Sequence, residues 1–282
     1  MISYLHNLDP VIVRLTKKYL LDEKVDPSIE GYSKRYLDLF DLDKKMWGEG
    51  VYSPKWISTH YTLLELIDME TDPNHPYLHL AMGKLLDHMW FKEGRVSKYR
   101  HQDMCVVAMM VYMACYLKIH DHRIDEMIDY IMLHHQHDGG WNCMWETAKS
   151  KKSSLHTTLS VLEAIAMYLN QGYEKYKDQL ILMRNSGEAF IFKKRFFRSE
   201  TTGEIIHHDF ATHHYPTRWK YDYFRAIWYF AKEKRPYHPV MEESLQKIEK
   251  ELKKGVLSTG KKYTGKTHFI LESRTSGFNT LR

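Results

Sequence analysis

The most informative stretch of this chain is Asp138-Gly-Gly-Trp-Asn142, followed after a short connection by Ser153-Ser-Leu-His-Thr-Thr-Leu-Ser-Val-Leu-Glu-Ala-Ile165. The paired glycines and the asparagine mark a turn, whereas the second segment has the length of a helix and is apolar on nearly every face. A helix that is apolar all round is buried on all sides. The stretch therefore predicts a turn that leads into a helix in the protein interior.

Similar segments recur along the chain, which indicates an internal repeat. In Trp56–Ile67, His60 matches His156, and in Asp103–Met110, Cys105 takes the same position. The fourth and fifth copies are Pro216–Ile227 and Arg274–Arg282. The copies recur about every 45 to 60 residues, and a glycine-rich turn precedes most of them.

Helices with one apolar face alternate with helices that are apolar all round. Tyr77–Phe91 has the i, i+3, i+4, i+7 pattern of the first kind, and Cys105–Leu117 and Leu155–Leu169 are of the second kind. Asp9-Pro10 begins an earlier helix, with aspartate as its N-cap. Because an outer and an inner layer explain this alternation, we expect an all-α protein. Its fold would be an α/α toroid, one domain over residues 1–282 with about five helical hairpins.

Composition excludes several classes of protein. The 282 residues are 43% hydrophobic and 27% charged, which is typical of globular proteins. The net charge, 41 − 36 = +5, is spread along the chain without a dense basic run, so we expect no nucleic-acid partner. The longest apolar run, Cys105–Leu117, is shorter than the roughly 18 residues of a membrane span. With three cysteines and no secretory pattern, the expectation is a soluble, cytoplasmic protein with free thiols.

The glycine turn of the third copy resembles a known family. Gln136-His-Asp-Gly-Gly-Trp141 is similar to the Q-x-x-D-G-G-W repeat of squalene cyclases and protein prenyltransferase beta subunits, with one residue fewer. Tyr52–Trp56, Phe197–Ser199 and Asn279–Arg282 also resemble segments of bacterial squalene cyclase-like and prenyltransferase-like proteins. The resemblance covers nearly the whole chain and implies the terpenoid cyclase and prenyltransferase toroid. It says less about activity, because these families share one fold across unrelated reactions.

The family's catalytic motifs separate two activities. Class II terpene cyclases protonate an alkene with a D-x-D-D motif, but the nearest run here, Asp38–Asp43, has a different spacing, so we do not expect triterpene cyclisation. Prenyltransferase beta subunits bind zinc through an Asp-x-Cys and a later His-Thr. By that resemblance, Asp103, Cys105 and His156 are the predicted zinc ligands. Thiolate, imidazole and carboxylate are suitable zinc donors, and three of them leave an open position for substrate.

Two further residues extend the zinc hypothesis. Cys143 would replace Asp103 in a Cys-Cys-His set that resembles lanthionine synthetase-like cyclases, although their local Cys-His pair is missing here. His60, one repeat earlier, would be a fourth ligand or a general base. The structural alternative stays open for all of these residues, because free cysteine commonly packs as a small hydrophobe and a single histidine on an inner helix is commonly a core residue.

Aromatic and basic residues gather in the turns and at the starts of the inner helices. They give a predicted substrate-binding set: Trp56, Trp145, Trp219, Tyr221, Arg218 and Arg225. The aromatic rings would contact an apolar chain or stabilise a cation, and the arginines would bind a diphosphate. Alternatively, the tryptophans brace helix ends and the arginines are solvated. For Trp47 and Trp141, which lie in the glycine turns, bracing is the preferred interpretation.

These patterns lead to one principal hypothesis and two alternatives. The chain is expected to be a toroid enzyme that acts on an isoprenoid or other apolar small molecule and uses zinc, with a second subunit as an open question. The first alternative is a non-catalytic toroid that binds a hydrophobic ligand or a partner. The second is a zinc-dependent cyclase that modifies peptide thiols.

Overall fold

The computed structural model describes residues 8–91, 95–97, 100–145, 149–254, 260 and 263–271. The predicted fifth repeat, Arg274–Arg282, lies outside these residues. The regular secondary structure of the described part is almost entirely helical. Its elements are α2 (Pro10–Leu20), α3 (Tyr32–Leu37), α4 (Thr59–Asp68), α5 (Pro76–Met89), β1 (Arg95–Ser97), β2 (Arg100–His101), α6 (Met104–Tyr116), α7 (His122–Leu133), α8 (Leu155–Asn170), α9 (Lys177–Lys193), η2 (His208–Ala211), α10 (Tyr223–Lys232), η3 (Pro239–Met241) and α11 (Glu242–Leu252).

The helix boundaries follow the local signals in the sequence. Asp9 caps α2 by accepting a hydrogen bond from the backbone N–H of Val11 at 2.9 Å, and Pro10 is the first helical residue. The one-sided pattern predicted at Tyr77–Phe91 is α5, and the two segments that are apolar all round are α6 and α8. The antiparallel pair β1–β2 was not predicted, because strands of three and two residues are too short to show a period of two.

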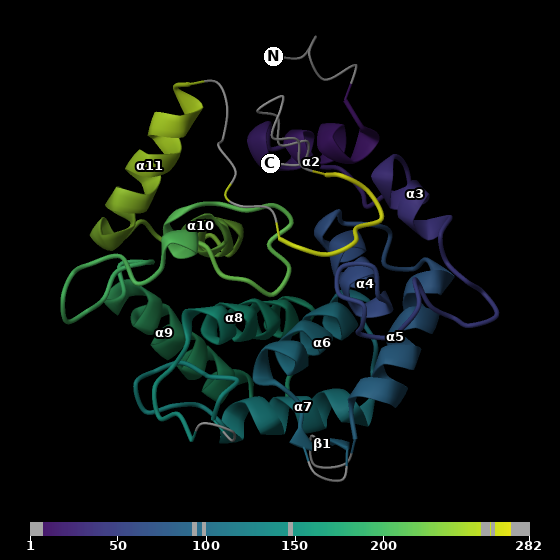
Figure 1. Ribbon diagram of the computed structural model, residues 1–282, viewed down its shortest axis with the longest axis horizontal. Coiled ribbons are helices and arrows are strands. Elements are labelled where there is room, and N and C mark those ends of the chain that lie inside the picture. The colour runs from purple at the N-terminus through teal and green to yellow at the C-terminus, as the bar shows by residue number, and fades with distance from the viewer. Residues whose placement is uncertain are drawn as a thin grey trace.

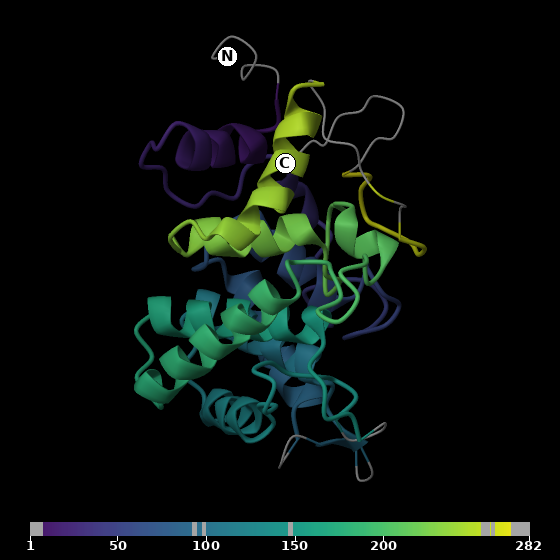
Figure 2. The same ribbon diagram turned by 90° about the vertical axis from the view of Figure 1, so that its left-hand side faces the viewer.

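The helices form two concentric arcs (Figure 1). Along the outer arc lie α5, α7, α9 and α11, while α4, α6, α8 and α10 lie inside it. Each inner helix contacts the outer helix that follows it in the chain, and the most extensive contact joins the two inner helices α6 and α8. Turned by 90°, α2 and α11 lie toward one end of the molecule and α7 toward the other (Figure 2).

Two tryptophans in the glycine turns tie the layers together in the same way. Trp47 donates its indole N–H to the backbone carbonyl of Tyr36 at 2.7 Å, and Trp141 donates to that of Ile131 at 2.8 Å. Both side chains are fully buried. Each indole is therefore buried with its N–H group hydrogen-bonded, and the bond holds the turn against the preceding helix.

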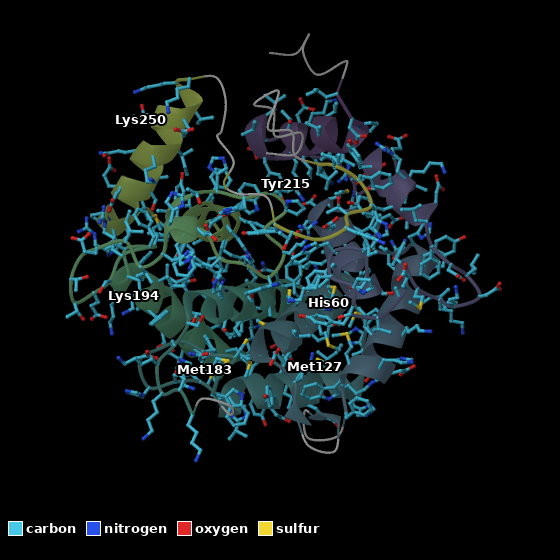
Figure 3. All side chains as sticks on the ribbon, in the orientation of Figure 1. His60, Met127, Met183, Lys194, Tyr215 and Lys250 are labelled. Carbon is cyan, nitrogen blue, oxygen red and sulfur yellow. The ribbon has the colours of Figure 1, made fainter. Side chains whose placement is uncertain are left out.

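The interior of the described part has two hydrophobic clusters, and the inner helix α8 contributes residues to both. Ten of the thirteen residues of α6 are buried, as the absence of a polar face predicts. His60 of α4 lies deep in the molecule, whereas Lys250 of α11 lies at its periphery (Figure 3). Across the described ranges, none of the helices combines the length and apolarity needed to span a bilayer.

Candidate functional site

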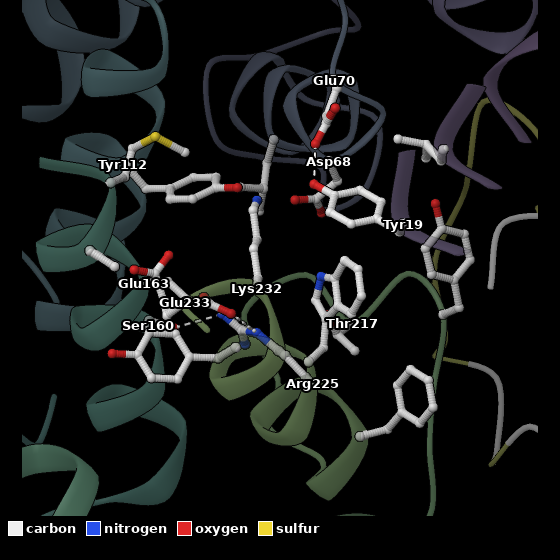
Figure 4. A pocket seen from close by; sticks show the side chains of 18 of the residues that line it. Tyr19, Asp68, Glu70, Tyr112, Ser160, Glu163, Thr217, Arg225, Lys232 and Glu233 are labelled. Carbon is white, nitrogen blue, oxygen red and sulfur yellow. Dashed lines mark hydrogen bonds and ion pairs between the residues drawn. The ribbon is translucent and has the colours of Figure 1, made fainter. Parts of the chain in front are cut away.

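A cavity of about 400 Å³ opens between the inner helices. The middle and later residues of α4, α6 and α8 line it, together with α10, α2 and the segment before α10 (Figure 4). Much of the lining is apolar: Ile12, Leu15, Leu20, Leu64, Met109, Ala166, Met167, Phe224 and Trp228. The ring of Trp228 meets Tyr19 edge-on, with 4.8 Å between centroids. A concave, largely apolar lining of this size suits a small apolar molecule.

Most charged groups at the cavity are paired. The Arg225 guanidinium binds both carboxylate oxygens of Glu163, with Nε to Oε1 at 3.0 Å, and it also donates to the Ser160 hydroxyl at 3.2 Å. Glu70 accepts hydrogen bonds from the Lys18 ammonium at 2.7 Å and from the Tyr19 hydroxyl. Each of these two carboxylates therefore has a cationic partner beside an apolar space.

Asp68 is the exception among the carboxylates. It is the last residue of α4, its side chain is accessible from the cavity, and it makes no hydrogen bond or ion pair with any described residue. The pKa of Asp68 is raised to about 7, first because the surrounding protein removes water from it and second because the Glu163 carboxylate repels its negative form. Lys232 and Arg225 oppose this rise. A carboxyl with this pKa exchanges its proton near neutral pH.

Two other cavity residues lie within electrostatic range of Asp68. Tyr112 of α6 has a raised pKa, because burial and then the charge of Asp68 disfavour the phenolate. Lys232, the last residue of α10, is exposed toward the cavity and has no hydrogen-bond or ion-pair partner among the residues that the structure describes. Asp68, Tyr112 and Lys232 therefore present a carboxyl, a hydroxyl and an amine to one space (Figure 4).

Both predicted arginines line this cavity, each held by a carboxylate. Arg225 binds Glu163 as described, and Arg218 binds Glu65 of α4, with Nε to Oε1 at 3.0 Å. Glu65 also accepts a hydrogen bond from the Tyr36 hydroxyl at 2.6 Å. Burial raises the pKa of Glu65, whereas Arg218 and the Tyr36 hydrogen bond oppose the rise.

The four predicted aromatic residues lie outside the cavity lining. Trp56 donates its indole N–H to the Thr264 carbonyl at 2.6 Å, and the Tyr221 hydroxyl donates to the Phe196 carbonyl at 2.6 Å. The other two contact histidines: Trp145 stacks on His134 at 3.7 Å between centroids, and Trp219 lies 5.3 Å from His156.

The predicted metal ligands lie at the other end of the inner helices. His60, Cys105 and His156 are the second residues of α4, α6 and α8, so the repeat register from the sequence places them at equivalent helix starts. The cavity, in contrast, is lined by later residues of these helices, such as Asp68 and Glu163. The predicted metal ligands on these three helices therefore lie at one end of the helices, and none of them lines the cavity.

The two cysteines of the predicted set come together. The Cys143 sulfur accepts hydrogen bonds from the Cys105 backbone N–H at 3.1 Å and from the Thr157 hydroxyl at 3.3 Å. The interaction between the two neighbouring thiols is the first cause that lowers the pKa of Cys143 and raises that of Cys105. Asp103 is the N-cap residue of α6, beside this pair.

The two histidines have different surroundings. Nδ1 of His156 accepts the backbone N–H of Tyr221 at 2.7 Å, and burial, followed by the charges of Arg225 and Lys220, lowers its pKa to about 4. Burial alone lowers the pKa of His60 to about 3, and neither of its ring nitrogens has a hydrogen-bond partner among the described residues. Both imidazoles are therefore neutral near pH 7.

Zinc binding stays a prediction. Within the described ranges, which include all five predicted ligands, no three His, Cys, Asp or Glu side chains are arranged to hold a metal ion. The Nδ1 bond of His156 to Tyr221 directs that imidazole nitrogen to the backbone. As the side chains lie, these residues do not fit a zinc centre.

The predicted site residues did not include Asp68, Tyr112, Glu163 or Lys232. A signal was available, because two apolar residues directly precede both Asp68 and Glu163 in helices that are mostly buried. Acidic residues in such helices are candidates for a functional site. Comparisons of the chain with family models, with curated proteins and with solved structures found no match.

Proposed function

We propose that this chain is an α/α-toroid enzyme that binds an isoprenoid or other apolar small molecule in the central cavity and transfers a proton through Asp68. The observation that carries the proposal is a carboxyl with a pKa of about 7 and no described partner, accessible from a largely apolar cavity. Functional acids and bases commonly combine these features.

The cavity supplies the requirements of general acid–base catalysis. With a pKa near the ambient pH, Asp68 exists in both forms, so it can give or take a proton without a large energetic cost. Arg225 pairs with Glu163, and the surrounding protein, followed by the Glu163 carboxylate, raises the pKa of Asp68. The apolar walls bind the substrate and exclude water from the proton transfer.

The helix arrangement supports the toroid part of the proposal. Four inner helices contribute side chains to one cavity, and each is backed by the outer helix that follows it. A closed double ring of helices has this order. The repeated tryptophan anchors in two of the turns agree with a repeated hairpin unit.

Ligand binding followed by turnover tests the proposal. The full chain is incubated with a panel of isoprenoid alcohols, prenyl diphosphates and fatty acids; binding is followed by tryptophan fluorescence, because Trp228 lies in the cavity wall, and products by mass spectrometry. We expect saturable binding and a product whose formation falls by roughly 100-fold or more in Asp68→Asn, with binding largely retained.

A matched substitution separates this effect from a general loss of charge. Asp129 lies on the outer helix α7, outside the cavity lining, and its carboxylate pairs with Lys175. Asp129→Asn should therefore leave turnover unchanged. Saturable binding without turnover would favour the non-catalytic ligand-binding toroid. Absence of binding across the panel would reject the apolar-substrate proposal.

A further inference from the structure

A second chemical feature lies outside the cavity, where the connection before α8 meets the start of α6. Cys143 precedes α8 by twelve residues, yet its sulfur lies 3.1 Å from the backbone nitrogen of Cys105. The Thr157 hydroxyl holds Cys143 twice, since it accepts the Cys143 N–H at 3.2 Å and donates to the sulfur at 3.3 Å. Neither cysteine lines the cavity.

Hydrogen-bond donors converge on the sulfur of Cys143. It accepts hydrogen bonds from the Cys105 backbone N–H and from the Thr157 hydroxyl. The N–H belongs to the first turn of the 13-residue helix α6, where the helix dipole favours negative charge. Two polar donors on one sulfur distinguish Cys143 from a thiol that is packed only among apolar groups.

Accessibility distinguishes this pair from the third cysteine. Cys105 and Cys143 are both partly exposed, whereas Cys115 is fully buried in α6. Because the Cys143 sulfur lies 3.1 Å from the Cys105 backbone nitrogen, the two residues are close enough for a disulfide to form by side-chain rotation.

We propose that Cys143 and Cys105 are a reactive dithiol, in which Cys143 is the nucleophile toward a hydroperoxide and Cys105 is the resolving thiol. The Cys143 thiolate attacks one peroxide oxygen, the O–O bond breaks, and the departing oxygen takes a proton and leaves as water or alcohol. The Cys105 thiol then attacks the Cys143 sulfenic acid, forms the S–S bond and releases water. The two sulfurs together lose two electrons, which reduce the peroxide.

Thiol counting on the full chain tests this proposal without any substitution. Protein that has been reduced and desalted is treated with one equivalent of hydrogen peroxide, its free thiols are titrated under denaturing conditions, and its peptides are mapped without reduction. We expect three free thiols to fall to one, Cys115, with the other two recovered as one linked Cys105–Cys143 peptide. Three thiols that persist would overturn the proposal.

Variants assign the two roles. In Cys105→Ser, the reaction should stop at a sulfenic acid on Cys143 that a dimedone probe captures, and in Cys143→Ser, peroxide consumption should be lost. Cys115→Ser, which removes the buried thiol, is the matched control and should still form the disulfide. If Cys105 reacts as fast in Cys143→Ser as in the parent chain, the assignment is wrong.

Zinc analysis distinguishes the dithiol from the predicted metal site. Elemental analysis precedes the peroxide treatment, on protein without a histidine tag. The dithiol proposal expects no stoichiometric zinc held by the pair. One equivalent of zinc that disappears in both Cys105→Ser and Cys143→Ser would overturn the proposal and assign the sulfurs as ligands.

Discussion

Asp68 of α4 and Glu163 of α8 open into the same cavity, yet only Glu163 is paired, through two hydrogen bonds from the Arg225 guanidinium. The pKa of Asp68 is raised to about 7, first because the surrounding protein removes water from it and second because the Glu163 carboxylate repels its negative form. One carboxyl group of the cavity is thus paired with a cation, while the other exchanges its proton near neutral pH.

The first prediction concerns the pH dependence of stability that Asp68 causes. Its pKa is 3.8 in the unfolded chain and about 7 in the folded one, so between these values the folded state binds more protons. The free energy of unfolding should therefore fall as pH rises from about 4 to about 7 because of this group. Urea denaturation of the parent chain and of Asp68→Asn over this range measures the effect. The stability of Asp68→Asn relative to the parent should increase with pH, and a constant difference would contradict the pKa.

The second prediction concerns the buried ion pair of Glu65 and Arg218, whose side chains are 4% and 5% exposed. Arg218→Met should lower the free energy of unfolding by about 3 to 5 kcal/mol, because it leaves a buried carboxylate without its partner. The double variant Glu65→Gln with Arg218→Met should regain more than half of this loss, since the amide oxygen still accepts from Tyr36 and carries no charge. Denaturant unfolding measures both. Equal losses in the single and double variants would show that Arg218 acts through packing alone.

The third prediction compares the two anchoring tryptophans. Trp47→Phe and Trp141→Phe each remove an indole N–H from a buried carbonyl and leave a void, so each should cost about 2 to 4 kcal/mol. Trp228→Phe is the matched control, because Trp228 is 41% exposed and lies at the cavity, and it should cost below about 1 kcal/mol. Thermal and denaturant unfolding report the three values. Similar losses at all three positions would argue against the anchoring role.

The fourth prediction concerns two glycines with opposite surroundings. At Gly140, in the turn before α8, an added Cβ would lie 2.3 Å from the Thr158 hydroxyl and 2.9 Å from the Ser153 Cβ. Gly140→Ala should therefore destabilise the protein by more than about 1 kcal/mol. Gly83, inside α5, has nothing within 4 Å of that position, and Gly83→Ala should stabilise by about 0.5 to 1 kcal/mol. The melting temperature should move in opposite directions, and a common direction would refute the packing argument.

Local patterns in the sequence predicted most of the helices. The periodicity of Tyr77–Phe91, the apolar runs of α6 and α8, and the Asp9-Pro10 cap all reappear in the structure, because helix formation and capping depend on residues within a few positions of one another. The repeat register likewise placed His60, Cys105 and His156 at equivalent helix starts.

Local patterns did not predict the contacts between helices. Only the packing of the helices places Cys143 beside Cys105, 38 residues away in sequence, and Arg218 beside Glu65, 153 residues away. It also places Asp68 at the cavity without a hydrogen-bond or ion-pair partner among the described residues. Such pairs depend on the rotation of each helix about its axis and on the path of the connecting loops. The amino-acid sequence of this protein therefore predicts the positions of most helices and which of them are buried, because these properties depend on residues that are close in sequence. The chemistry of the site arises only where those helices pack against one another.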